Sequence, residues 1–408
     1  MCGSGNNWGS VYTAAHHHSR SVVGGEDASV GLGGLIQNGG HGYLSSHYGL
    51  ASDQVYQVTV VTTDGRILVA NSVQNEDLFW AIRGGGGGQY GVVTEFVLKT
   101  HPVPTNVVKA SLSFYAANKS KASETASWNA LSKVVSLIPD LMDGGLFGNI
   151  TAYTKTRAMA LGLSEVPPGV AAVIGLIGFN MTTDHVDNIV NELASRVNDI
   201  GYGSYLNISI EPASSESYWS FVNPDPLLSN TAGSVSLMTS RLMGRRELSD
   251  IAQHKLTTYL QQALVSEDPE AGTMLLFGLQ GGRGPASIPE HMRGSVLPAW
   301  RNAYAHVFTL GASINATGDA SELLKAGADY YEAVKEPVWR KWAPNTGSYM
   351  NEGNPFSSTW KKDFYGKNYD KLLSIKRKYD PTESLFVWSG VGSDLWNNDM
   401  RTGLLCRV

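Results

Sequence analysis

Two glycine-rich segments could bring main chain against a flat or phosphorylated ligand. The first reads SVGLGGLIQNGGHG (29–42) and the second RGGGGGQYGVVTEF (83–96). Glycine lets backbone amides approach a ligand closely, and it supplies turns with positive φ. The segments therefore predict a ligand-binding main chain, with tight turns and no ligand as the alternative.

The spacing of these glycines does not fit the two common nucleotide motifs. Gly31-x-Gly33-Gly34 is followed by a gap of four residues before Gly39, so a dinucleotide fingerprint of the G-x-G-x-x-G type is excluded. No Gly-Lys-Ser/Thr follows either segment, which excludes a P-loop.

Tyr349 and Asn351 form a Tyr-x-Asn pair that could share one ligand. Residues two apart on an extended strand point to the same face, so the spacing predicts that both side chains meet that ligand. Tyr349 is the candidate base, provided that its neighbours lower its pKa from about 10. An ordinary strand tyrosine followed by a turn asparagine is the alternative.

The cysteine and histidine content predicts no metal site. Cys2 and Cys406 are the two cysteines, too few for a disulfide framework or a cysteine-based metal cluster. The run His16-His17-His18 follows two alanines in a predicted helix, and we interpret it as an exposed polar face.

Composition narrows the possible partners. A formal charge of −5, with scattered lysine and arginine, argues against a nucleic-acid partner. The apolar run at 170–179 is about half the length that a membrane span requires, roughly 20 residues. Five N-x-S/T acceptors are compatible with a glycoprotein, although chance explains them equally well; they are Asn118, Asn149, Asn180, Asn207 and Asn315. The oligomeric state stays open.

The elements that must position these residues are strands and helices in mixed order. Residues 55–63 and 66–70 predict a hairpin turning at Asp64-Gly65, Asn75 is expected to cap a short helix, and 91–100 predicts a further strand. From about residue 104, strands are predicted at 107–115, 169–180, 271–282 and 303–314. Helices are predicted at 121–137, 183–200, 247–265 and 318–338. The fold class is α+β, with an antiparallel sheet backed by helices.

Three stretches carry a resemblance to a known family. They are VGGEDASVGLGGLIQNGGHGYLSSHYGLASDQVYQVTVVTTDGRIL, NEDLFWAIRGGGGGQYGVVTEFVLK and SYMNEGNPFSSTWKKDFYGKNYDKLLSIKRKYDPTESLF. The chain resembles berberine bridge enzyme-like oxidases of the vanillyl-alcohol-oxidase (PCMH-type) superfamily, especially fungal proteins of the isoamyl-alcohol-oxidase type. The resemblance implies a partial FAD-binding domain (1–104), a substrate-binding domain (105–346) and a C-terminal element that returns to the FAD domain (347–408).

The resemblance also implies site residues. The expected FAD contacts are Val30, Gly31, Gly33, Gly34, Gly39, Gly40, His41, Gly42, Gly91, Val93 and Asn351. A valine at position 30 is associated in the family with access of oxygen to the flavin. Besides Tyr349, the family landmarks Gly281-Gly282 and Pro298-Ala299-Trp300-Arg301 bring Gln280 and His306 in as catalytic candidates.

The sequence departs from the family at the flavin attachment points. The family's R-S-G-G-H-like loop would lie upstream of Met1, and Asp27 stands where many members have a cysteine. We therefore expect an N-terminally truncated chain that binds FAD non-covalently if it binds it. Full-length relatives usually carry a secretion signal, so the parent protein is expected in the secretory pathway.

The resemblance implies oxidation of a small organic substrate, an alcohol or a secondary metabolite, by hydride transfer to flavin with O2 as the acceptor. The alternative is a catalytically inactive truncated paralogue without a competent flavin site.

Overall fold

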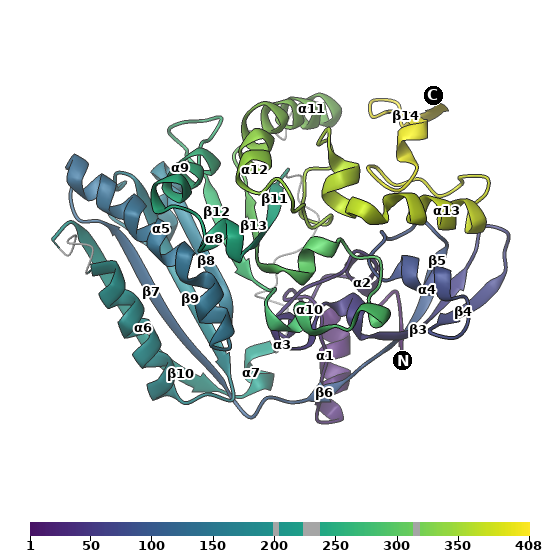
Figure 1. The fold of residues 1–408 in the computed structure, drawn as a ribbon, viewed down its shortest axis with the longest axis horizontal. Helices are drawn as coiled ribbons and strands as arrows, with labels where there is room; N and C mark the ends of the chain where they lie inside the picture. The colour runs from purple at the N-terminus through teal and green to yellow at the C-terminus, as the bar shows by residue number, and fades with distance from the viewer. Residues whose placement is uncertain (199–203, 223–236, 313–318) are drawn as a thin grey trace.

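An antiparallel sheet of seven strands is the largest element of the computed structural model, which describes residues 1–198, 204–222, 237–312 and 319–408 (Figure 1). The strand order is β10-β7-β9-β8-β12-β13-β11. The strands are β7 (Val107–Ala116), β8 (Leu146–Thr154), β9 (Val170–Phe179), β10 (Leu206–Glu216), β11 (Thr239–Gly244), β12 (Met274–Leu279) and β13 (Ala303–Thr309). The predicted antiparallel sheet is confirmed.

Helices cover one face of this sheet and bury its apolar side chains. They are α5 (Lys121–Asp143), α6 (Thr183–Asn198), α8 (Arg245–Leu248), α9 (Gln253–Ala263) and α12 (Glu336–Trp342). Side chains alternate between the two faces of a strand. Ala305 and Val307 of β13 pack in the core under the helices, so His306 between them faces the opposite side. That side is where the candidate site lies.

The second lobe is built on a four-stranded antiparallel sheet in the order β1-β5-β3-β4. These strands are β1 (Cys2–Gly3), β3 (Val55–Val61), β4 (Ile67–Asn71) and β5 (Val92–Leu98). The helices beside them are α1 (Trp8–His17), α2 (Leu32–Gln37), α3 (Ser45–Tyr48) and α4 (Glu76–Ile82). The predicted hairpin is confirmed, with Gly65 at φ +80° in the turn between β3 and β4.

The C-terminal part of the chain packs into the core of this second lobe. Helix α13 (Tyr369–Tyr379) lies beside α4 (Figure 1), and its Leu372 and Ile375 share one buried cluster with Leu78 and Ile82. Segments almost 300 positions apart in the chain thus form one core. The domain boundaries at 104 and 346 stay predictions.

Shorter elements complete the chain. They are β2 (Arg20–Ser21), β6 (His101–Pro102), α7 (Tyr218–Val222), α10 (Arg283–Ser287), α11 (Ala320–Tyr330), β14 (Trp396–Asp399) and β15 (Leu404–Arg407), with the 3₁₀ segments η1 (Ala51–Gln54), η2 (Lys155–Leu161), η3 (Glu290–Met292), η4 (Pro298–Arg301), η7 (Gly366–Asn368) and η8 (Ser393–Leu395) between the longer elements. Among the described residues, no helix combines the length and apolar character that crossing a membrane demands. The three histidines His16, His17 and His18 are exposed at the end of α1, as expected.

Several predicted elements differ in detail. The helix predicted at 247–265 is two helices, α8 and α9, and strands β8, β10 and β11 were not predicted. The helix predicted at 318–338 is α11, a π-helical turn η5 (Tyr331–Lys335) and α12. Asn75 does begin α4, but it does so with left-handed backbone (φ +49°), and its side chain donates to the carbonyl of Val69 rather than capping the helix. Residues 199, 200, 313, 314, 315 and 318, which belong to predicted elements or acceptors, lie outside the described residues.

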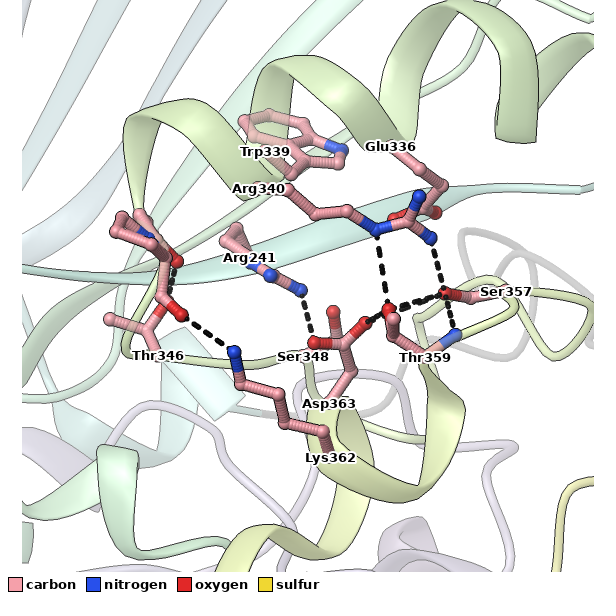
Figure 2. Close-up of polar contacts among 12 residues, drawn as sticks. Arg241, Glu336, Trp339, Arg340, Thr346, Ser348, Ser357, Thr359, Lys362 and Asp363 are labelled. Carbon is pink, nitrogen blue, oxygen red and sulfur yellow. Dashed lines mark hydrogen bonds and ion pairs between the residues drawn. The ribbon is translucent and has the colours of Figure 1, made fainter.

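A buried ion pair joins the seven-stranded sheet to the C-terminal part. Arg241 of β11 lies 2.8 Å from Asp363 of η6 (Lys361–Tyr365), and both side chains are at most 3% exposed. Figure 2 shows that Thr359 also donates to Asp363 and in turn accepts from Arg340 of α12. The network holds the segment that follows α12, which carries Tyr349, against the sheet.

Candidate functional site

Four titratable side chains from three parts of the chain meet where the two lobes adjoin. They are His41 after α2, His306 of β13, and Tyr349 and Glu352 from the segment after α12. Oε2 of Glu352 lies 3.2 Å from Nδ1 of His306 and 3.7 Å from Nε2 of His41. The ring of Tyr349 lies 4.9 Å from that of His41 and 5.6 Å from that of His306, between centroids.

A tight turn, and not a strand, brings Tyr349 and Glu352 to the site. The amide of Glu352 donates to the carbonyl of Tyr349 at 3.0 Å. The prediction of an extended strand at Tyr349 and Asn351 is therefore wrong, because the chain reverses there. The two side chains still meet, since Asn351 Nδ2 donates to Tyr349 Oη at 2.6 Å.

Hydrogen bonds connect both glycine-rich segments to Tyr349. The amide of Gly87 donates to Asn38 Oδ1 at 2.8 Å, and Asn38 donates in turn to Asn351. The amide of Gly40 interacts with Tyr349 as well. Both glycine-rich segments thus reach Tyr349, the first through Gly40 and Asn38 and the second through Gly87.

Glu352 and His306 have pKa values that set their charges at neutral pH. Burial acts to raise the pKa of Glu352, but the neighbouring imidazoles outweigh it and lower the value to about 2. Burial lowers the pKa of His306 to about 4, although Glu352 opposes this shift. His306 is therefore a neutral proton acceptor beside an ionised carboxylate. Its Nε2 has no hydrogen-bond partner among the described residues.

Tyr349 is buried at 3% exposure, and this sets the direction of its pKa. Burial, followed by the charge of Glu352, raises the pKa of Tyr349 well above its ordinary value, although Asn351 and Gly40 donate to the phenol oxygen. Tyr349 is a candidate base only if its neighbours lower its pKa, and this condition is not met, because desolvation outweighs two donors. Tyr349 stays a neutral phenol.

Gln280 follows β12 and faces the site with an acidic partner. Its Nε2 donates to Glu26, and its Oε1 has no partner within the described part of the chain. Burial raises the pKa of Glu26, while His41 and Gln280 oppose that shift. Polar side chains therefore run from His41 through Glu26 to Gln280.

The predicted cofactor-contacting glycines fall into two groups. A Cβ on Gly34 of α2 would meet nothing within 4 Å, and the same holds for Gly31. A Cβ on Gly42 would lie 1.8 Å from the carbonyl oxygen of Gly24, and one on Gly40 2.3 Å from the side chain of Leu35. Gly42 and Gly40 are thus required by packing within the lobe, whereas Gly31 and Gly34 border free space; a Cβ on Gly33 would be in ordinary contact with the Ser4 carbonyl oxygen at 3.8 Å.

Four other predicted contacts, Gly91, Val93, Val30 and Gly39, pack within the lobe. Gly91 (φ +146°) packs against Val60 and Val61 at a register shift between β3 and β5, and Val93 is 6% exposed in the same sheet. Val30 is half-buried, and its carbonyl accepts from the amide of Trp8. Gly39, with φ +108°, packs against Val296.

The sequence did not single out Glu352, Glu26 or Asn38 as site residues. Trp300 was noted only as a landmark, yet its buried ring lies 5.8 Å from Tyr349 and 5.9 Å from His41. Glu352 lies three residues after Tyr349, and this local spacing was the available signal. The partners of Glu26 and Asn38 are more than 250 positions away, and no local pattern reveals them.

The site fits the flat ring end of a flavin in its chemistry. Buried polar atoms without partners in the described residues, on His41, His306 and Gln280, offer donors and acceptors, and the open Gly31 and Gly34 lie in the same lobe as His41. Such orphaned groups are costly unless a ligand or water satisfies them. The fold and site are of the flavin-binding class, with a partial cofactor lobe and an antiparallel substrate lobe.

Comparison with known proteins agrees with this class. A family model described as FAD binding domain matches residues 1–71, and one described as Berberine and berberine like matches 348–388. The VAO-type flavoprotein oxidase VAO615 of Thermothelomyces thermophilus is 30% identical over 98% of this chain, and the FAD-linked oxidoreductase patO of Aspergillus clavatus is 31% identical over 98%. This chain spans 64% of the length of each.

A solved structure extends the likeness to the fold. The VAO-type flavoprotein MtVAO713 from Myceliophthora thermophila C1 superposes with a TM-score of 0.86 at 28% identity, over 99% of this chain and 68% of that one. The chain belongs to the VAO/berberine-bridge-type family of FAD-linked oxidoreductases.

Proposed function

We propose that this chain takes part in oxidising a small organic substrate, an alcohol or a secondary metabolite, with FAD bound non-covalently. The observation that carries the proposal is the neutral, buried His306, whose Nε2 has no partner in the described residues and whose Nδ1 faces the Glu352 carboxylate. A carboxylate at one ring nitrogen favours the tautomer that leaves the other nitrogen free to accept a proton.

The residues of the chain have separate roles in this proposal. His306 Nε2 accepts the proton of the substrate hydroxyl, and Glu352 orients the imidazole and stabilises the charge that develops on it. Tyr349, a neutral phenol, and Gln280 position the substrate. The ring of Trp300 closes the site against water. When bound, FAD would supply the two-electron acceptor that O2 regenerates with release of hydrogen peroxide.

The residues that would hold the ring are those at the open glycines. Gly31 and Gly34 offer main chain with free space beside it, and Asn351 and His41 would supply polar contacts to the ring. Val30 next to them favours reaction with O2 by the family resemblance. The known activity of the longer relatives supports this proposal without deciding the substrate.

The test is reconstitution followed by an activity assay. The protein is purified with excess FAD, gel-filtered, and examined for the visible absorbance of bound flavin. It is then mixed with a panel of primary and secondary alcohols while oxygen uptake and peroxide are recorded. Bound flavin with substrate-dependent peroxide supports the proposal. Protein that remains colourless and inert contradicts it and favours the inactive paralogue.

The exposed glycosylation acceptors support a proposal on location. Asn118, Asn149, Asn180 and Asn207 are all exposed in the structure. We propose that the parent protein passes through the secretory pathway and is glycosylated there. Expression in a secreting fungal host, with a mass shift on treatment with a glycosidase, is the result expected.

A further inference from the structure

A set of three ligand atoms, one each from His41, His306 and Glu352, lies within 4.8 Å of one another. Two of the separations are 3.2 Å and 3.7 Å. Zinc with nitrogen and oxygen ligands at 2.0–2.1 Å in a tetrahedron places its ligands about 3.4 Å apart. The three side chains thus stand close to the spacing of a tetrahedral metal site, with a small inward movement of one imidazole.

The donor types suit a first-row transition metal. Two imidazoles and one carboxylate are characteristic ligands of Zn2+ and Co2+, and three protein ligands leave the fourth position open. Ca2+ and Mg2+ prefer oxygen ligands alone, so they fit this set poorly. The donor set therefore selects for borderline-soft cations.

The donors are also available. Nδ1 of the buried His306 and Nε2 of His41 are the ring atoms that face Oε2 of Glu352, and both ring nitrogens of His41 have no hydrogen-bond partner within the described residues. The Glu352 side chain is 31% exposed and the His41 side chain 15%, while the His41 ring nitrogens themselves are buried, so an ion would enter past the carboxylate. The Trp300 and Tyr349 rings pack around the imidazoles and limit the water that would compete for the ion.

We propose that His41, His306 and Glu352 form a binding site for one divalent transition-metal ion, with Zn2+ as the preferred occupant. The site does not require FAD. It goes beyond the proposed oxidation, because a bound metal would occupy His306 Nδ1 and the Glu352 carboxylate, which otherwise orient the proton-accepting imidazole. Metal-loaded and metal-free protein would then differ in their capacity for acid–base chemistry.

The exposed histidines at the end of α1 would confuse a direct measurement. His16, His17 and His18 could bind Co2+ or Zn2+ adventitiously. Every metal measurement therefore starts from the variant His16→Ala/His17→Ala/His18→Ala, which is called the parent in these measurements. It is prepared without flavin and treated with a chelator. Metal is then added as Co2+, which absorbs visibly when tetrahedral, or as Zn2+ followed by gel filtration and metal analysis.

The expected result is one ion per chain and a tetrahedral Co2+ spectrum. Loss of even a supporting partner costs a metal site roughly 10–100-fold in affinity, so E352Q and H306A should each weaken binding by about 100-fold or more. E352Q changes a partly exposed turn residue and should fold, which keeps the test informative if H306A does not. H47A, a histidine on α3 outside the cluster, is the matched control and should bind like the parent.

The proposal is overturned if E352Q binds the ion as tightly as the parent, or if binding disappears with the removal of His16, His17 and His18. Because flavin is absent from these measurements, a failure to bind FAD would leave the metal result unchanged. A protein that binds FAD and produces peroxide but takes up no metal would support the proposed oxidation and overturn the proposed metal site.

Discussion

The proton transfer that we propose depends on a single imidazole. His306→Gln keeps a polar side chain of similar reach but removes the proton acceptor, so the rate of flavin reduction in the loaded protein should fall by about 10²–10⁴-fold. Tyr349→Phe should cost less than about 10-fold, because burial keeps this phenol protonated and its role is positional. Anaerobic stopped-flow reduction measures both. If Tyr349→Phe lowers the rate of flavin reduction more than His306→Gln does, Tyr349 and not His306 is the proton acceptor.

A second histidine should make stability depend on pH. His101 stacks on Tyr48 at 3.8 Å, lies 2.9 Å from Gln54 through Nε2, and has a pKa lowered to about 4, first by burial and then by nearby cations. The ordinary value of 6.5 applies in the unfolded chain. Between these values the unfolded state binds more protons, so the stability present above pH 6.5 is lost as the pH falls towards 4.

His101→Gln removes this contribution. The melting temperature of the parent should decline between pH 6.5 and 4, and the decline should be shallower in the variant. Some slope should remain, because burial also lowers the pKa values of His306 and His47. Identical slopes in parent and variant, measured by calorimetry in matched buffers, would refute this assignment.

At the scale of elements, the local sequence pattern predicted the hairpin and helices whose residues are close together in the chain. The β3–β4 hairpin follows from alternating apolar residues around Asp64-Gly65, and α5 and α6 follow from their apolar periodicity. Strand β10 was missed because its buried residues are few: of its eleven residues, Leu206 is the one that is buried. Long-range pairings, such as Glu26 with Gln280, escaped because they arise when distant segments pack.

The ion pair between β11 and η6 should be an essential link. Asp363→Asn leaves Arg241 charged and buried at 1% exposure, and breaking one partner of such a pair costs about 3–5 kcal/mol. Asp329→Asn is the matched control, because its pair with Lys325 is 69% exposed on both sides and is worth at most about 1 kcal/mol. Urea unfolding compares the two. Equal losses would show that the buried pair carries no special share of the stability.

The first glycine-rich segment offers two glycines that separate ligand binding from folding, Gly34 in α2 and Gly42 between α2 and α3. Gly34→Ala adds a methyl group into free space within a helix, where alanine exceeds glycine by up to about 1 kcal/mol, so the protein should be slightly more stable. If a flavin ring lies over that position, the same change should weaken FAD binding. Gly42→Ala, just beyond the helix, places a methyl group against the Gly24 carbonyl and should destabilise by about 1–3 kcal/mol or more.

Thermal melting would measure the stability of Gly34→Ala and Gly42→Ala, and equilibrium dialysis would measure their affinity for FAD. A Gly34→Ala protein that is more stable and binds FAD like the parent would place the ring elsewhere. The contrast depends on the surroundings of each glycine. Sequence cannot supply these, since both positions lie in the same glycine-rich segment.

For the whole molecule, the arrangement of the two lobes makes the cofactor a stabilising ligand. The candidate site takes His41 from one lobe and His306 from the seven-stranded sheet of the other. Tyr349 comes from the segment that follows α12. A ligand that binds there contacts the folded arrangement and not the unfolded chain. It should therefore raise the free energy of unfolding by about 2.7 kcal/mol at a concentration one hundred times its Kd.

The rise should scale with the logarithm of FAD concentration, and riboflavin should reproduce part of it, because the residues of the candidate site would contact the ring and not the phosphates. Adenosine diphosphate, which lacks the ring, is the control and should shift the melting temperature less than riboflavin does. If adenosine diphosphate stabilises the protein and riboflavin does not, the open glycines and the His41–His306–Tyr349 group do not surround the ring. The binding proposal would then have to move to another part of the chain.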